Sequence, residues 1–119
     1  ARILPPYCYF SETTVDLTGS ATSKDYDIAL QILARDPAVH VLMPFFVFQD
    51  TPLDEGIVEV MARIKAFGKP IICCASGGRY TREMSKRIED LSVPVYERPE
   101  GAAAAAHALA VQAEIARKT

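Results

Sequence analysis

The sequence predicts a three-layer α/β fold in which helices cover both faces of a parallel sheet. Two observations lead to this prediction: short apolar runs alternate with amphipathic segments, and glycine or proline marks the turns between them. Parallel strands need a crossover long enough to hold a helix. The elements follow the order helix, strand, helix, strand, helix, strand, helix. Right-handed crossovers would place the three strands side by side.

The first part of the chain holds a lead-in, a helix and a strand. We expect an irregular lead-in over residues 1–22 and a helix from a Ser23 cap to about Arg35, because apolar residues recur there at helical spacing. Residues 39–48 are apolar apart from one histidine, which indicates a buried strand. Pro44 removes a ladder donor from that strand and therefore favours a sheet edge or a bulge.

The rest of the chain continues the alternation. Proline is favoured at the first position of a helix and glycine just past its end, so we expect a helix that begins at Thr51-Pro52 and stops at Gly68. The Gly77-Gly78 turn separates the second strand from the third helix. The remaining expected elements are a strand over 70–75, a helix over about 80–91, a strand over 93–96 and a helix over about 99–117.

Size and composition indicate a single domain, 1–119, that can bury a core without disulfides or metals. The chain has 119 residues, of which 50% are hydrophobic, and a formal net charge of −2. This balance gives no sign of a nucleic-acid surface or of a basic membrane patch. No apolar run in the sequence approaches the roughly 20 residues that a membrane helix needs.

The cysteines indicate a reduced protein. Cys8, Cys73 and Cys74 are odd in number, and adjacent cysteines in a strand point to opposite faces of the sheet, so Cys73 and Cys74 cannot readily bridge each other. We therefore expect inert strand thiols and a cytoplasmic location. The first strand would also present an unpaired apolar edge, at which we expect self-association.

Two turns at the carboxyl ends of the strands form the candidate binding site. Ligands of open parallel sheets collect at this edge, where helix N-termini present free amides. The candidate residues are Gln49, Asp50 and Thr51 in the first turn, and Ser76, Gly77 and Gly78 in the second. A Ser-Gly-Gly turn lets the backbone approach an anion closely. Taken alone, it is explained more simply as a tight turn, since it is neither a Walker loop nor a GxGxxG fingerprint.

The sequence indicates no catalytic and no metal-binding residue. His40 falls in an expected strand and His107 in an expected helix, without a partner motif near either. Ser76 lacks the pattern of a nucleophile elbow. The cysteines and histidines do not have the spacing of a zinc site.

Several short phrases, in this order and spacing, are similar to those of one family. They are Leu4-Pro5-Pro6-Tyr7, Val15-Asp16-Leu17-Thr18-Gly19, Ala29-Leu30, Asp36-Pro37, Gly68-Lys69-Pro70-Ile71, Gly77-Gly78, Val93-Pro94-Val95-Tyr96 and Arg98-Pro99-Glu100. Together they resemble the flavodoxin-like module at the carboxyl end of the alpha part of nucleoside-diphosphate-forming acyl-CoA synthetases. These enzymes are the ADP-forming acetate–CoA ligase relatives of succinyl-CoA synthetase.

The chain departs from the family pattern in three places. Thr13-Thr14 stands where the family usually has Asn-Pro, and Phe48 stands where a proline is usual. The family module also begins with two strands and a glycine-rich turn that are not present here. The resemblance therefore implies a flavodoxin-like βα order that is truncated at the N-terminus, with three strands left and the missing first strand beside the 39–48 segment.

The resemblance implies a supporting role in a larger enzyme. The family converts acyl-CoA, ADP and phosphate to the acid, ATP and CoA through a phosphorylated histidine, in a Ser-His-Thr-Gly stretch that this chain lacks. A helix N-terminus of the module would hold the phosphohistidine loop, with the amides around Gln49, Asp50 and Thr51 as the best candidates. The fragment would be inactive alone and bind no cofactor. The parent would use CoA and ATP or ADP with Mg, and its other domains or subunits would be the partners.

Two other functions remain open at this point. The same synthetase-like array could be a catalytically silent regulatory module fused to the acetyl-transfer domain of a protein acetyltransferase. The chain could also be a free-standing flavodoxin-like binding or receiver domain. A receiver would need an acidic cluster near a first strand and a phosphorylatable aspartate after a middle strand, whereas here only Asp50 follows the first expected strand.

Overall fold

The computed structural model describes residues 9–10, 15–17, 20–48 and 51–118. Its elements, in chain order, are β1 Tyr9–Phe10, β2 Val15–Asp16, α1 Ser23–Arg35, β3 Phe45–Phe46, α2 Gly56–Lys65, β4 Cys73–Ala75, α3 Arg79–Glu89, β5 Val95–Tyr96 and α4 Pro99–Lys118. From α1 onward this is the predicted alternation of helices and strands. No helix in the described part of the chain is long and apolar enough to cross a bilayer.

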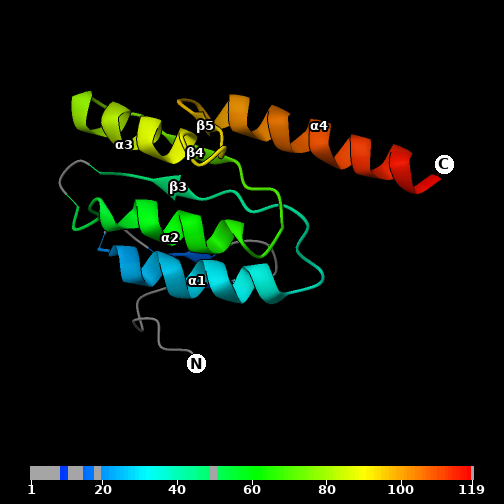
Figure 1. Ribbon diagram of the computed structural model, residues 1–119, viewed down its shortest axis with the longest axis horizontal. Coiled ribbons are helices and arrows are strands. Elements are labelled where there is room, and N and C mark those ends of the chain that lie inside the picture. The colour runs from blue at the N-terminus through cyan, green and yellow to red at the C-terminus, as the bar shows by residue number, and fades with distance from the viewer. Residues whose placement is uncertain (1–8, 11–14, 18–19, 49–50, 119) are drawn as a thin grey trace.

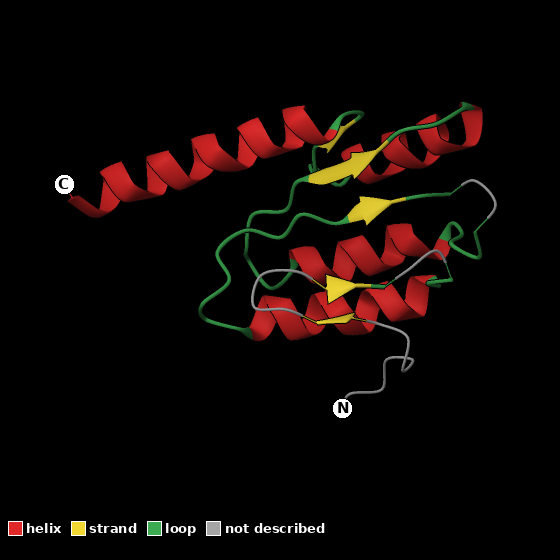
Figure 2. Ribbon diagram, turned by 180° about the vertical axis from the view of Figure 1, so that it is seen from behind, coloured by secondary structure: helices red, strands yellow, loops and turns green. Residues whose placement is uncertain are grey.

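The main sheet is three-stranded and parallel, in the order β3-β4-β5, which confirms the predicted fold class (Figure 2). Phe45 pairs with Cys74, and Cys73 pairs with Val95. The predicted edge position of the first strand of this sheet is also confirmed, because among the described strands β3 pairs only with β4. The structure is therefore compatible with a fragment of a flavodoxin-like fold.

Pro44 explains why β3 is much shorter than the predicted 39–48 strand. The segment pairs with its neighbour at Leu42, whose N–H donates to the Pro70 carbonyl at 2.9 Å and whose carbonyl accepts from Ile72 at 2.9 Å. Two residues on, the Pro44 carbonyl accepts from Cys74 at 3.0 Å, but proline has no N–H to return. The ladder is therefore interrupted between the bridge at Leu42 and β3.

The lead-in is not wholly irregular, which corrects the prediction for 1–22. β1 and β2 form a separate antiparallel pair, with Tyr9 opposite Asp16 and Phe10 opposite Val15. Aromatic and β-branched residues favour strands. Two-residue strands are too short, however, to show the alternation that identifies a strand in a sequence.

Three helices cover one face of the main sheet and one helix covers the other. α1, α2 and α3 share a core with the strands, in which Ile57, Met61, Ile64 and Ile88 are completely buried. α4 packs on the opposite face through Ala102, against Ile72 and Cys74. The carboxyl-terminal half of α4 extends beyond the rest of the molecule (Figure 1). The three layers confirm the prediction of helices on both faces.

The start of α1 and the end of α2 follow local sequence signals. Thr22, rather than the predicted Ser23, caps α1 and forms a capping box with Asp25: the Asp25 N–H donates to Thr22 at 3.3 Å and the Thr22 N–H to Asp25 at 3.0 Å. Gly68 follows α2 with a φ of 89°, a conformation that favours glycine and that confirms the predicted stop. The predicted limits of α3 and α4 are wrong by at most two residues.

The start of α2 corrects a second prediction, because the helix begins at Gly56 and not at Thr51-Pro52. The Thr51 hydroxyl donates to the Val47 carbonyl at 2.5 Å and accepts from the Leu53 N–H at 3.4 Å, which bends the chain before the helix. Leu53 is 4% exposed and packs in the core. These contacts hold residues 51–53 in a turn and delay the helix.

Candidate functional site

The first candidate turn is only partly described. Gln49 and Asp50 lie outside the described residues, so the structure does not test their assignment. Thr51 is described, and both hydrogen bonds of its hydroxyl lie within its own loop. Because α2 starts five residues later, Thr51 is not part of the first turn of that helix.

A carboxylate of the chain itself occupies the start of α2. The Asp54 Oδ1 accepts from the Gly56 N–H at 3.0 Å and from the Ser23 hydroxyl at 2.8 Å. Ser23 belongs to the first turn of α1, so this carboxylate links the beginnings of two neighbouring helices. A negative charge at a helix N-terminus is favourable. Asp54 therefore takes the position that an external anion would need at α2.

The second candidate turn is exposed, and no side chain caps the helix that follows it. Ser76, Gly77 and Gly78 are exposed and connect the end of β4 to the start of α3. Gly78 is the N-cap of α3 and has no side chain to accept from the first-turn amides, and the first hydrogen bond back along the chain joins the Arg82 N–H to the Gly78 carbonyl at 3.0 Å. The start of α3 is thus an uncapped helix N-terminus, of the kind that binds anions.

The two glycines of this turn have different requirements. Gly77 has a φ of 153°, and a Cβ there would lie 2.6 Å from the Thr81 Oγ1. A side chain at this position would be strained and would also collide with Thr81. Gly78 has a φ of −85°, and nothing lies within 4 Å of the position that its Cβ would take. Gly77 is therefore needed for the fold, whereas Gly78 faces open space.

Aromatic contacts bring the end of the β3 segment next to the start of α3. The Phe48 ring packs edge-on against Tyr80 with ring centroids 5.7 Å apart, and it lies 6.0 Å from the Phe46 ring. Phe48 immediately precedes the first candidate turn, and Tyr80 follows the second by two residues. The two turns thus lie at the same edge of the sheet, as expected for the carboxyl ends of parallel strands.

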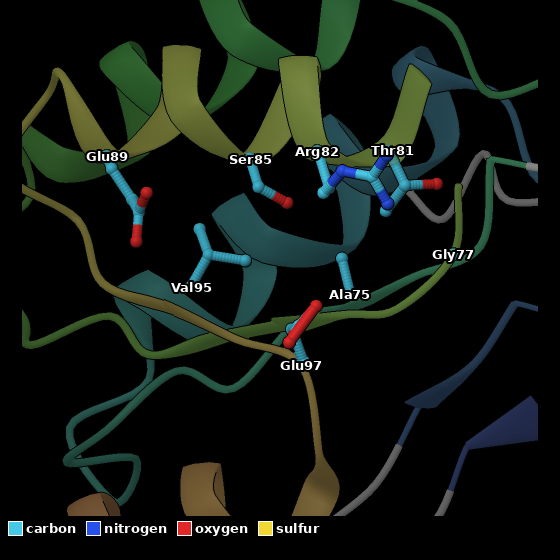
Figure 3. A pocket seen from close by; sticks show the side chains of 8 residues that line it. All are labelled: Ala75, Gly77, Thr81, Arg82, Ser85, Glu89, Val95 and Glu97. Carbon is cyan, nitrogen blue, oxygen red and sulfur yellow. The ribbon is translucent and has the colours of Figure 1, made fainter. Parts of the chain in front are cut away.

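A cavity of about 250 Å³ lies beside the Gly77 turn (Figure 3). Its lining includes Thr81, Arg82, Ser85 and Glu89 of α3 and Glu97 just after β5. These residues could not be identified as a site from the sequence, because charged side chains along a helix usually form its solvated surface. One signal was present: Thr81, Ser85 and Glu89 recur every four residues and so share one side of α3.

Cys73 and Cys74 are buried on opposite faces of the sheet, as predicted. Cys73 packs in the core shared by α1, α2 and α3, and Cys74 packs under α4. Burial, with a smaller contribution from Cys74, raises the pKa of the Cys73 thiol to about 12. Burial and then Glu100 raise the pKa of Cys74. Both thiols are therefore protonated at neutral pH and are poor nucleophiles.

The histidines do not add a catalytic group to the site. His40 and His107 are both exposed, His40 ahead of β3 and His107 on α4. His107 thus lies on the exposed surface of α4. In the part of the chain that the structure describes, no group of histidine, cysteine, aspartate and glutamate side chains is arranged to hold a metal ion.

The chain is similar in sequence to part of a ligase subunit. No known protein-family profile matches the chain. Over 117 residues it is 33% identical to the alpha subunit of an ADP-forming acetate–CoA ligase II from Pyrococcus furiosus, an alignment that covers 93% of this chain and 25% of the relative. The chain thus spans about a quarter of the length of the curated relative it matches. This similarity supports a relationship to a domain of an acyl-CoA synthetase.

Proposed function

We propose that this chain is a domain of an ADP-forming acyl-CoA synthetase and that it supports the phosphohistidine step without performing chemistry itself. The observation that carries this proposal is the 33% identity with the alpha subunit of an ADP-forming acetate–CoA ligase over 93% of the chain. The proposed overall reaction of the parent converts acyl-CoA, ADP and phosphate to the acid, ATP and CoA. Its partners would be the other domains or subunits of that synthetase.

The start of α3 is the best candidate for the contact with the phosphohistidine loop. Its first-turn amides have no side-chain cap, and the turn before it contains Ser76, Gly77 and Gly78. The start of α2, by contrast, already holds the Asp54 carboxylate. A phosphate group is stabilised by free amides and by the positive end of the helix dipole. Contacts of Gln49, Asp50 and Thr51 with the same loop remain a prediction.

We assign no catalytic residue to this chain. Its two described thiols are protonated at neutral pH, and neither histidine forms an ion pair with a carboxylate among the described residues. CoA, ATP or ADP, and Mg would be bound by other domains of the parent. A cytoplasmic location also remains a prediction.

The assignment of the α3 N-terminus can be tested in the parent protein with Gly78→Leu. A leucine side chain finds open space within this domain, so the fold should tolerate it, but it would block the approach of a partner loop. We expect ATP formation from acetyl-CoA, ADP and phosphate to fall about tenfold or more, together with acid-labile phosphate on the protein. The matched control is Ala38→Leu, at an exposed position before β3.

The outcomes separate the two parts of the proposal. Activity of the parent with loss in Gly78→Leu and not in Ala38→Leu would support both. Equal activity in the two variants would remove the α3 contact while leaving the synthetase assignment in place. A parent without ATP formation from acetyl-CoA or other acyl-CoA esters would contradict the synthetase assignment itself.

A further inference from the structure

The cavity between α3 and β5 has chemically distinct walls (Figure 3). Ala75 and Val95 contribute apolar surface, while Thr81 and Arg82 lie toward the start of α3 and Glu89 toward its end. Glu97 borders the cavity from the other side, after β5. The volume of about 250 Å³ equals the liquid volume of about eight water molecules, which is sufficient for a small metabolite.

Thr81 is the most informative residue of this cavity. It is 4% exposed, yet its hydroxyl forms no hydrogen bond within the described part of the chain. No fully enclosed side-chain oxygen or nitrogen among the described residues lacks a partner, so the Thr81 hydroxyl keeps a small exposure, and it faces the Gly77 end of the cavity (Figure 3). Buried hydroxyl groups normally have partners. A partner supplied by a ligand would satisfy this one.

The charges around the cavity are also uncompensated. Within the described residues the ion pairs are Arg63 with Asp27 and Arg87 with Glu55, and neither involves Arg82, Glu89 or Glu97. The positive character is at the start of α3, where Arg82 adds its charge to uncapped amides. The negative character comes from two glutamates: Glu97, after β5, lies beside Ala75 toward the start of α3, and Glu89 lies at the end of α3 (Figure 3).

We propose that this cavity binds a small zwitterion, with its carboxylate at Thr81, Arg82 and the first turn of α3, and its ammonium group at Glu97. A ligand with only a negative charge would meet the two glutamates, and a ligand with only a positive charge would meet Arg82 and the helix N-terminus. An aliphatic stem between the two charged groups would contact Val95 and Ala75. This site concerns a free small molecule and does not depend on the proposed function.

The test is an NMR titration of this chain, labelled with ¹⁵N, with three compounds that share one carbon frame. 4-Aminobutyrate carries both charges, butyrate only the carboxylate and butylamine only the ammonium group. We expect saturable shifts of the Gly77, Thr81 and Ser85 amide signals with 4-aminobutyrate, and affinity for it about tenfold or more above that for the other two. Glycine and 6-aminohexanoate, titrated in parallel, would show which separation of the charges fits best.

Two variants locate the binding. Thr81→Val keeps the shape of the side chain and removes only the hydroxyl, so affinity should fall about tenfold while the melting temperature stays the same or rises. Glu97→Gln should lower affinity to a similar extent. The control, Glu83→Gln, changes an exposed charge of α3 that does not line the cavity and should leave affinity unchanged.

Three results would overturn the inference. One is the absence of a saturable shift with glycine, 4-aminobutyrate and 6-aminohexanoate alike. Another is binding of butyrate or butylamine as tight as that of the amino acids, which would mean that one charge suffices. The third is a lower melting temperature of Thr81→Val with unchanged binding, which would make the hydroxyl a structural group.

Discussion

The two faces of the main sheet are covered in different ways. On one face α1, α2 and α3 contribute large aliphatic side chains, and Ile57, Met61, Ile64 and Ile88 are completely buried. On the other face a single helix, α4, packs on the sheet through the completely buried Ala102. Phe45 and Val47 alternate with the buried Phe46 and so belong to this second face, where they remain 47% and 59% exposed.

The difference shows where the stability of this chain comes from. Burial of a large aliphatic side chain stabilises a protein by about 1.5–3 kcal/mol, and an alanine contributes much less because it has less surface to bury. Alanine brings α4 close to the sheet but leaves the carboxyl-terminal part of the β3 segment uncovered. We therefore expect the three-helix face to dominate the free energy of unfolding.

Truncation of one apolar side chain on each face should test this difference most clearly. Ile88→Ala, on the three-helix face, should lower the free energy of unfolding by about 2–5 kcal/mol. Leu109→Ala, on α4, should cost less, because Leu109 is only partly buried. Urea unfolding followed by circular dichroism measures both. If Ile88→Ala does not fold, Ile88→Val, with an expected cost of about 0.5–1.5 kcal/mol, provides the comparison. Equal losses of unfolding free energy on the two faces would contradict the expectation that the three-helix face dominates stability.

The adjacent cysteines provide a second comparison of the faces, through pH. The unfolded Cys73 thiol has a pKa of 9.0, and burial raises the pKa to about 12 in the folded chain. The native state thus keeps a proton that the unfolded state releases, so this contribution to stability is complete below pH 9 and is lost as the pH rises toward 12. The loss is about 1.4 kcal/mol per pH unit.

Cys73→Ala isolates this effect. Between pH 8 and pH 10 the free energy of unfolding should fall by about 1.4 kcal/mol more in the original chain than in the variant. The matched variant Cys74→Ala should change the pH dependence less, since the pKa of Cys74 is raised by a smaller amount. Urea unfolding at the two pH values gives both differences. An identical pH dependence in the original chain and Cys73→Ala would show that Cys73 is not a desolvated thiol in the native state.

The free edge of β3 is the third comparison, between a paired and an unpaired side of one strand. Residues 39–48 carry no aspartate, glutamate, lysine or arginine, so no like charges oppose the approach of a second copy of this chain. Two outward carbonyls are already bonded: Phe45 accepts from the Tyr26 hydroxyl at 2.6 Å and Val47 from Thr51 at 2.5 Å. The N–H groups on the same outward side of β3 would donate to a strand of the second copy.

We predict a concentration-dependent dimer in sedimentation at tens of micromolar, and its loss in Val47→Lys. A lysine on an edge strand prevents pairing because its charge would be buried in the new interface. Val111→Lys, at a 43% exposed position of α4, should leave the dimer intact and serves as the control. If the original chain is a monomer, or if only Val111→Lys dissociates the dimer, the β3 edge does not mediate association.

The sequence predicted the order of the elements well, because that order depends on local patterns. Alternating apolar runs and amphipathic segments gave the parallel three-stranded sheet, and Gly68 gave the end of α2. Contacts between distant residues decided the rest. The start of α2 depends on Asp54, which bonds to Ser23 some thirty residues away, and no local pattern contains that bond.

The site was predictable to a smaller extent. The Gly77-Gly78 turn was identified from its composition and from the position of turns in parallel sheets. The cavity beside it was not, because Glu97 reaches it only after β5 has paired with β4. Arg82 and Glu89 resemble other surface charges of α3 until that packing is known. A sequence shows the chemistry of such side chains, whereas their grouping is a property of the fold.

The smallest predicted effect concerns two ion pairs, both among the helices of the three-helix face. Asp27 of α1 accepts from Arg63 of α2 at 3.0 Å, and its side chain is 19% exposed, whereas that of Arg63 is 55% exposed. Exposed pairs of this kind contribute about 0.2–1 kcal/mol. Asp27→Asn keeps the acceptor for Gln31 and should cost no more than that, a loss that 1 M salt should largely abolish. Arg87→Gln, which breaks the 3.6 Å pair with Glu55, should cost less still, because both side chains are more exposed than Asp27. A loss above about 2 kcal/mol in Asp27→Asn would mean that charge, and not apolar burial, holds α1 against α2.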